Sequence, residues 1–140
     1  MNIGKRIAAL ALTGAVVGSG LIATTAGTAG AATQGEAVAR SCYGNALSYT
    51  KDAGTHIYPN YPNFYYLIAT SNCADINIKT NTDRYVKVCF LTSGGGKDCQ
   101  DNYKLATKGD WTVIATNVRD NAKFQFYFRS DAKSTGYSAA

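Results

Sequence analysis

The sequence predicts an all-β fold: a small antiparallel β-sandwich or partly open barrel of about six to eight strands, held by two disulfides. Strand-forming residues dominate, because all ten tyrosines and all five phenylalanines follow residue 42, whereas glutamate occurs once. Several segments alternate apolar and polar residues between turns spaced about 8–12 residues apart, which is typical of sandwiches and barrels. The four cysteines supply the two bridges.

The N-terminal segment has the order of a secretory signal. Lys5 and Arg6 precede an uncharged, mostly apolar run over residues 7–22, and small residues follow up to Ala32. The run is shorter than the roughly 20 apolar residues that a helix needs to cross a bilayer. We therefore expect residues 1–32 to be a signal peptide that is removed by cleavage.

The mature chain is expected to be a single secreted β domain, residues 33–140, with an ordered core over about residues 41–131. Its small, polar tail after Asp131 is expected to fray. Losing the signal lowers the formal net charge from +5 to about +3. We expect an extracellular monomer without membrane attachment, in a compartment where cysteines oxidise.

The start of the mature chain leaves two structures open. A short helix over residues 36–39 and a strand over residues 46–50 both fit the sequence. The triplet Tyr-Pro-Asn occurs twice over residues 58–63, and each proline favours extended geometry in the residue before it. This part is therefore expected to be an irregular aromatic loop.

Three strands are expected next, over residues 64–70, 75–80 and 84–91. In the second and third, apolar residues recur at every second position, namely Ile76, Ile78, Val86, Val88 and Phe90. Period-two alternation places these side chains on one face of a sheet. Residues 81–83 are expected to join the two strands as a hairpin.

Three more strands are expected beyond a glycine-rich tip at residues 94–96, over residues 103–107, 111–118 and 124–129. The last strand places Phe124, Phe126 and Phe128 on one face, which predicts core positions. Burying each ring contributes roughly 1.5–3 kcal/mol. Trp111 opens its strand and is expected in the core rather than as a platform for sugars.

The four cysteines allow three pairings. A hairpin turning about Gly94 places Cys89 opposite Cys99, within reach of a disulfide. A bridge between Cys73 and Cys89 fits the preceding hairpin less well. The predicted bridges are therefore Cys89–Cys99 and Cys42–Cys73. A zinc site is disfavoured, because Cys-x-x-Cys pairs are absent from the sequence.

Groups suited to catalysis are scarce. His56 is the single histidine and Glu36 the single glutamate. A secreted ribonuclease would pair a carboxylate base with a histidine acid, which makes His56 its candidate, but a lone histidine beside a turn is more often solvated. We predict no catalytic residue, metal site or cofactor. Basic residues are scattered among aspartates along the chain, so we expect no nucleic-acid partner.

Aromatic residues indicate recognition instead. Five of them lie within nine residues around two prolines: Tyr58, Tyr61, Phe64, Tyr65 and Tyr66. Tyrosine combines a flat apolar ring with a hydroxyl and loses little entropy on binding. We predict this loop as the contact surface, near the glycine-rich tip. The alternative is that Phe64 with Tyr65 or Tyr66 closes one end of the sandwich.

Residues 41–136 resemble the small secreted β proteins that filamentous actinomycetes export. The resemblance lies in Asp75-Ile-Asn-Ile-Lys, Arg84-Tyr-Val-Lys-Val-Cys and Gly109-Asp-Trp-Thr-Val-Ile-Ala-Thr. It implies export and a β-sandwich, and it carries no activity or site.

Two narrower similarities concern binding proteins. Residues 75–79 and 108–115 resemble strands of bacterial SH3-like wall-binding modules, although residues 80–82 depart from the Gly-Pro-Ser run of those modules. Secreted α-amylase inhibitors are similar in size, class and cysteine count. Their inhibitory Trp-Arg-Tyr triplet is absent, because Thr112 follows Trp111.

We therefore expect a secreted, non-enzymatic binding protein that acts at the cell envelope or in the medium through its aromatic loop. Its partner would be a cell-wall glycan or an extracellular protein. The alternatives are an inhibitor of a secreted hydrolase and, second, a small hydrolase such as a ribonuclease using His56.

Overall fold

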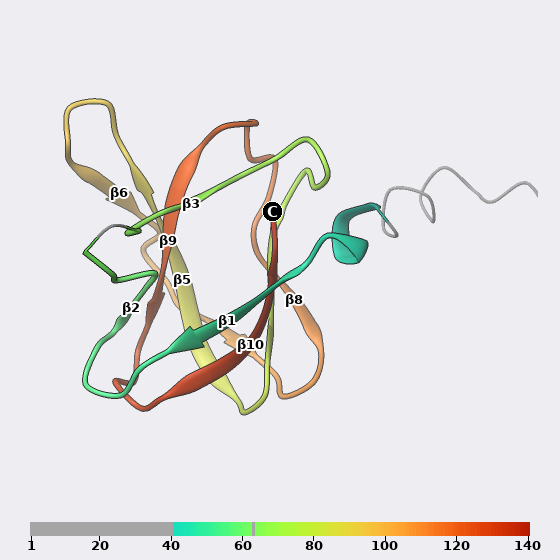
Figure 1. Ribbon diagram of the computed structural model, residues 1–140, viewed down its shortest axis with the longest axis vertical. Helices are drawn as coiled ribbons and strands as arrows, with labels where there is room; N and C mark the ends of the chain where they lie inside the picture. The colour runs from blue at the N-terminus through green and yellow to red at the C-terminus, as the bar shows by residue number, and fades with distance from the viewer. Residues whose placement is uncertain (1–40, 63) are drawn as a thin grey trace, which may run out of the picture. The chain divides into compact units, whose positions relative to one another are not determined.

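The computed structural model describes residues 41–62 and 64–140 and shows an all-β domain built from two antiparallel sheets (Figure 1). The predicted signal peptide, its cleavage site and the alternative helix over residues 36–39 lie outside the described residues. Within them, one helical turn at residues 41–44 precedes the first strand, which confirms the alternative of a strand near residues 46–50.

The four-stranded sheet, called sheet A, contains in spatial order β1 (Leu47–Lys51), β10 (Ser134–Ala139), β4 (Ile76–Thr80) and β8 (Trp111–Ala115). Sheet B contains β2 (Ile57–Tyr58), β9 (Lys123–Phe128), β5 (Arg84–Leu91) and β6 (Lys97–Cys99). Beside these, β3 (Leu67–Ile68) pairs with β9 and β7 (Lys104–Ala106) pairs with β5. The predicted antiparallel sandwich is confirmed, and four of its ten strands are only two or three residues long.

The core lies between the inner faces of the two sheets. Phe124, Phe126 and Phe128 of β9 are fully buried, as the alternation predicts. Val86 and Val88 of β5 lie beside them and are also fully buried. Sheet A contributes Tyr49, Ile76, Ile78, Ile114 and Ala115 to the same cluster. These apolar side chains supply the main stabilisation of the domain.

The turn at residues 81–83 does not close a hairpin, contrary to the expectation from the sequence. β4 pairs with β10 and β8, whereas β5 pairs with β9, β6 and β7 in the other sheet. The turn therefore carries the chain from sheet A to sheet B. Ile78 of β4 and Val86 of β5 face the same core from opposite sheets. The alternation of apolar and polar residues in these two strands is therefore the same whether the turn closes a hairpin or crosses between sheets.

The expectation that the chain frays after Asp131 is wrong, because β10 is a central strand of sheet A. It pairs with β1 on one side and with β4 on the other. Ser134 and Ser138 are buried, and Gly136 lies where a Cβ atom would overlap the carbonyl oxygen of Lys79. Small residues allow β10 to fit between its neighbours, and the same composition is typical of a frayed tail.

Two predicted strands are shorter than expected. Only β3 forms within residues 64–70, and the strand expected over residues 111–118 ends at Ala115. Asn117 has a φ of 52°, and its N–H donates to Asp75 Oδ1 at 3.0 Å. This left-handed residue turns the chain out of the sheet.

Both predicted disulfides are present. Cys89 and Cys99 face each other across β5 and β6, as the hairpin register predicts. Cys42–Cys73 ties the helical turn to the segment before β4 and packs with Ala139. By the loop-entropy estimate the two bridges contribute about 2.7 and 3.7 kcal/mol respectively. Both values are large beside the net stability of a small domain.

Lys51 is a charged residue within the domain, with 1% of its surface exposed. Its ammonium group donates to the backbone oxygens of Asp52, Thr55 and Asp131, and it lies 5.4 Å from the ring centroid of Phe128. Burial is the main cause that lowers its pKa. The three carbonyl oxygens replace the water that would otherwise solvate the ammonium group. By binding all three, Lys51 joins the loops at this end of the sandwich.

Gly136→Ala should destabilise the domain by about 3 kcal/mol or more, because the added Cβ overlaps the Lys79 carbonyl and the φ of 156° disfavours any side chain. Urea unfolding of the oxidised protein measures this. Gly94→Ala is the control, since nothing lies within 4 Å of a Cβ at that position. An unchanged unfolding midpoint for Gly136→Ala would contradict the central position of β10.

Stability should fall at high pH because of Tyr49, whose pKa burial raises to about 12 despite a hydrogen bond with Ser134 at 2.8 Å. The unfolded chain releases this proton near pH 10. The stabilisation by protonated Tyr49 is therefore complete below pH 10 and is lost as pH rises towards 12. Between pH 8 and pH 11, the wild type should lose about 1 kcal/mol more than Tyr49→Phe in urea unfolding. Equal losses would contradict the raised pKa.

Candidate functional site

The aromatic loop leaves sheet B after β2 and rejoins it at β3, so that both of its ends pair with the same edge of β9. Tyr58, at its start, is buried at 9% exposure and packs against Tyr49, with ring centroids 5.3 Å apart. Burial also raises the pKa of Tyr58. The prediction that Tyr58 belongs to an exposed contact surface is therefore wrong. Its position opposite Phe126 directs the ring into the core.

Hydrogen bonds link the described residues of the loop to one another and to both sheets. Buried Gln125 of β9 donates from Nε2 to the carbonyl oxygen of Pro59 at 3.2 Å. Tyr61 and Phe64 exchange two backbone hydrogen bonds of 3.1 Å each. The Tyr61 hydroxyl donates to the carbonyl of Thr50 in β1 at 3.0 Å, which ties the loop to sheet A. The loop is thus anchored to both sheets.

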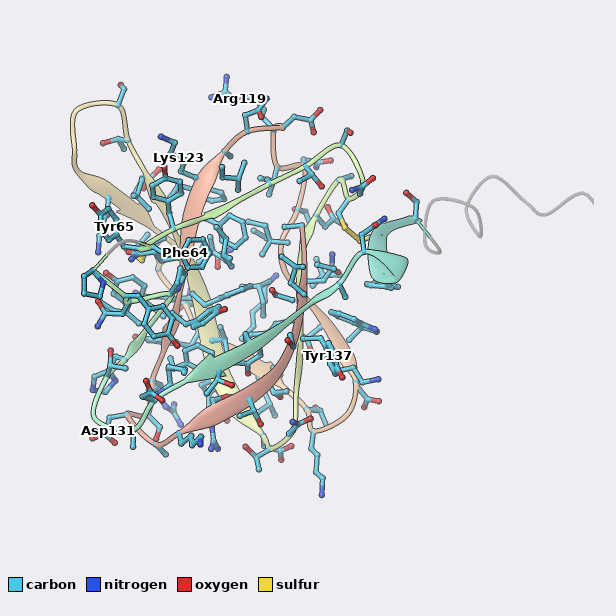
Figure 2. All side chains as sticks on the ribbon, in the orientation of Figure 1. Phe64, Tyr65, Arg119, Lys123, Asp131 and Tyr137 are labelled. Carbon is cyan, nitrogen blue, oxygen red and sulfur yellow. A yellow bond between two sulfur atoms is a disulfide. The ribbon has the colours of Figure 1, made fainter. Side chains whose placement is uncertain are left out.

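Phe64 and Tyr65 lie on the surface, with 47% and 52% of their areas exposed. Tyr66 is half-buried behind them, in edge contact with Tyr65 at a centroid distance of 6.2 Å. The Lys123 ammonium lies 4.7 Å from the Tyr66 ring centroid. Figure 2 shows Phe64 and Tyr65 near each other on the β3 side of the domain. These side chains do not close the end of the sandwich.

Two aliphatic residues outside the predicted contact surface extend it. Leu47 of β1 and Ile68 of β3 are 65% and 48% exposed. With Phe64, Tyr65 and Tyr66 they line a concavity of about 510 Å³. We call Leu47, Phe64, Tyr65 and Ile68 the apolar patch. None of the described residues that line its concavity is charged.

A larger hollow of about 1050 Å³ lies beside the tip of the β5–β6 hairpin. Its lining includes Gly95 of the tip, the charged residues Asp98, Arg119 and Lys123, and also Tyr66, which is shared with the apolar concavity. In Figure 2, Arg119 and Lys123 lie at the same end of the domain. Gly95 of the glycine-rich tip and Tyr66 of the aromatic loop therefore line the same hollow, which the sequence did not predict.

Gln100, which also lines the hollow, links the two sheets. Its Oε1 accepts the N–H of Val88 at 2.9 Å, and its Nε2 donates to the carbonyl of Ile114 at 2.9 Å. Val88 lies in sheet B and Ile114 in sheet A. This part of the lining is therefore held by hydrogen bonds to both sheets.

His56 is exposed, and its Nδ1 lies 3.1 Å from the carbonyl oxygen of Phe128. Its described hydrogen bond is therefore to the backbone and does not include the carboxylate partner that a ribonuclease site requires. Among the described residues, no group of three or more metal-binding side chains is found.

Trp111 does not join the main core. It is half-buried on the outer face of sheet A, stacked on Tyr43 at a centroid distance of 4.6 Å and an interplanar angle of 19°. It packs against the small cluster around Cys42 and Cys73. The prediction that Trp111 lies in the main core is therefore wrong. Its ring instead packs on the helical turn that carries Cys42 and Tyr43.

Comparison with protein-family models, with curated proteins and with solved structures finds no match to this chain. Within the described residues, no helix is long and apolar enough to cross a membrane.

Tyr61→Phe should loosen the loop, because it removes the hydrogen bond to Thr50. One such bond contributes about 1 kcal/mol, so amide hydrogen exchange at Phe64 should become roughly five-fold faster. Tyr137→Phe is the control, since Tyr137 is similarly exposed on β10. Unchanged exchange in Tyr61→Phe would show that the loop is held without this contact.

Proposed function

We propose that this is a secreted, non-enzymatic binding protein that contacts another extracellular protein through the apolar patch. Two observations support export. The N-terminus has basic residues, then an apolar run, then small residues, as a secretory signal does. The domain also contains two disulfides. Cross-links of this kind persist in oxidising compartments and are rare in the cytosol.

The observation that carries the proposal is the exposure of four large apolar side chains around one concavity. Monomeric proteins rarely leave large contiguous apolar patches exposed unless the patch has a partner. The loop that presents Phe64 and Tyr65 is already held by Gln125 and Thr50. Binding therefore requires little further ordering of the loop, which leaves more of the contact energy for affinity.

The chemistry of the patch favours a protein over a cell-wall glycan. Protein interfaces have aromatic and aliphatic residues at their centres and few charges there. Leu47 and Ile68 offer only hydrocarbon, and Phe64 has no hydroxyl. A glycan requires hydrogen-bonding groups for its hydroxyls, and the apolar concavity presents mainly hydrocarbon.

A secreted hydrolase is the second candidate partner, with this protein as its inhibitor. The anchored loop favours it, because inhibitors that change little on binding present a rigid segment to the enzyme. Stoichiometric inhibition of a partner hydrolase would identify this form of the proposed function.

The test is binding by the double variant Phe64→Ala/Tyr65→Ala of the oxidised mature protein. A partner captured from the medium or envelope of the producing organism is first identified, and its Kd is then measured. The variant should bind at least about 30-fold more weakly, because exposed aromatic residues at an interface centre contribute about 2 kcal/mol or more.

Tyr137→Ala is the matched control, because Tyr137 is 48% exposed but lies on β10 in sheet A. It should bind as the wild type does. Equal affinity of the double variant would contradict the assigned surface. Patch-dependent binding to purified peptidoglycan or chitin, without a protein, would contradict the class of partner.

A further inference from the structure

Positive charge gathers on the outer face of sheet B, although the basic residues are scattered along the sequence. The strand register places Tyr127 of β9 opposite Lys87 of β5, and the Lys87 ammonium lies over the ring of Tyr103, the residue before β7. Beside it, the Arg129 N–H donates to the Tyr85 carbonyl at 2.9 Å, and Tyr85 pairs with Leu105 of β7. We call Lys87, Lys97 and Arg129, with Tyr85, Tyr103 and Tyr127, the cationic face.

Each cation of this face lies over one tyrosine ring. The Arg129 guanidinium carbon is 3.8 Å from the Tyr85 ring centroid. The ammonium groups of Lys87 and Lys97 lie 4.9 and 5.2 Å from the centroids of Tyr103 and Tyr127 respectively. Lys97 also donates to the Tyr127 hydroxyl at 2.7 Å. The rings thus hold three cations in place before any ligand binds.

Carboxylates are absent from the described strand positions of this face. Asp98 is the only aspartate within a described strand, and it pairs with Phe90, a position that faces away from the cationic face. The other seven aspartates lie in turns and loops. The cationic face therefore has no acidic group among its strands to neutralise it, and it complements an anion.

We propose that the cationic face binds a linear acidic polysaccharide. Lys87 leans towards Tyr103 on the β7 side, whereas Lys97 reaches across β5 to Tyr127 on β9. Neighbouring strands are about 4.8 Å apart, so the backbones that carry these two rings, on either side of β5, are about 10 Å apart. Cations that diverge in this way do not converge on one small anion, but they match charges repeated along a polymer.

Two other polyanions fit this face less well. Single-stranded nucleic acid binds through aromatic rings on which bases stack, but Tyr85, Tyr103 and Tyr127 are each covered by their own cation. An acidic protein would require an apolar interface centre, and here the centre is charged. Sugar hydroxyls and carboxylates, by contrast, pair with ammonium, guanidinium and tyrosine hydroxyl groups.

The test uses the oxidised mature protein and polygalacturonate, with neutral dextran as the uncharged probe. Binding to polygalacturonate should be at least about 10-fold weaker for the triple variant Lys87→Gln/Lys97→Gln/Arg129→Gln than for the wild type. It should also weaken steeply with salt, because Lys97 and Arg129 are exposed and Lys87 is half-exposed. Dextran should not bind.

The matched control is Lys79→Gln/Lys108→Gln/Lys133→Gln, which removes the same charge from positions outside the cationic face. It should retain wild-type affinity, and thermal unfolding confirms that both variants fold. Equal loss in the two variants would overturn the proposal, because net charge alone would then explain binding. Tighter binding to a thymidine oligonucleotide or to phosphatidylglycerol vesicles would also overturn it. The Phe64→Ala/Tyr65→Ala variant should bind polygalacturonate normally, which separates this proposal from the proposed function.

Discussion

The pairing of β9 with β5 is the constraint on which the rest of the structure depends. Its inner face carries Phe124, Phe126 and Phe128, which close the core against sheet A. Its outer face carries Tyr127, whose ring faces the Lys97 ammonium, and the next outward residue, Arg129, lies over the Tyr85 ring of β5. Because successive residues of a strand point to opposite faces, the stability of the core and the register of the outer face are set together. A slip of one residue would bury the charges and expose the rings.

The edge of β9 that faces away from β5 fixes both ends of the aromatic loop. β2 and β3 both pair with this edge, and the loop between them passes Gln125, whose side chain holds Pro59. The loop is therefore fixed at both ends and near its start. Apolar side chains that point outwards from such a loop remain exposed without collapsing onto the domain. The apolar patch therefore depends on the pairing of β2 and β3 with β9, and not only on the number of aromatic residues in the loop.

Features that depend on residues close together in the sequence could be predicted. Alternation along β5 and β9 identified the inward-facing residues, and the glycine-rich tip set the register that pairs Cys89 with Cys99. The sequence does not determine which sheet a strand joins, because a strand that faces the core alternates in the same way in either sheet.

The strand β10 could not be predicted, because small residues fit both a frayed tail and a crowded central strand. Tyr58 and Tyr65 look equivalent in sequence, and only pairing with β9 separates the buried ring from the exposed one. Leu47 joins the patch from sheet A, a contact that no local pattern encodes.

The two proposed contact surfaces differ in the interaction that would attract a partner. The apolar patch offers hydrocarbon on an anchored loop, so a partner gains mainly by removing apolar area from water. The cationic face offers charges that are already ordered over tyrosine rings, so its attraction depends on ionic strength. Lys123 of β9 lies over the Tyr66 ring, which lines the apolar concavity, and both residues also line the larger hollow. A protein held on an acidic polymer by one surface would present the other to passing partners.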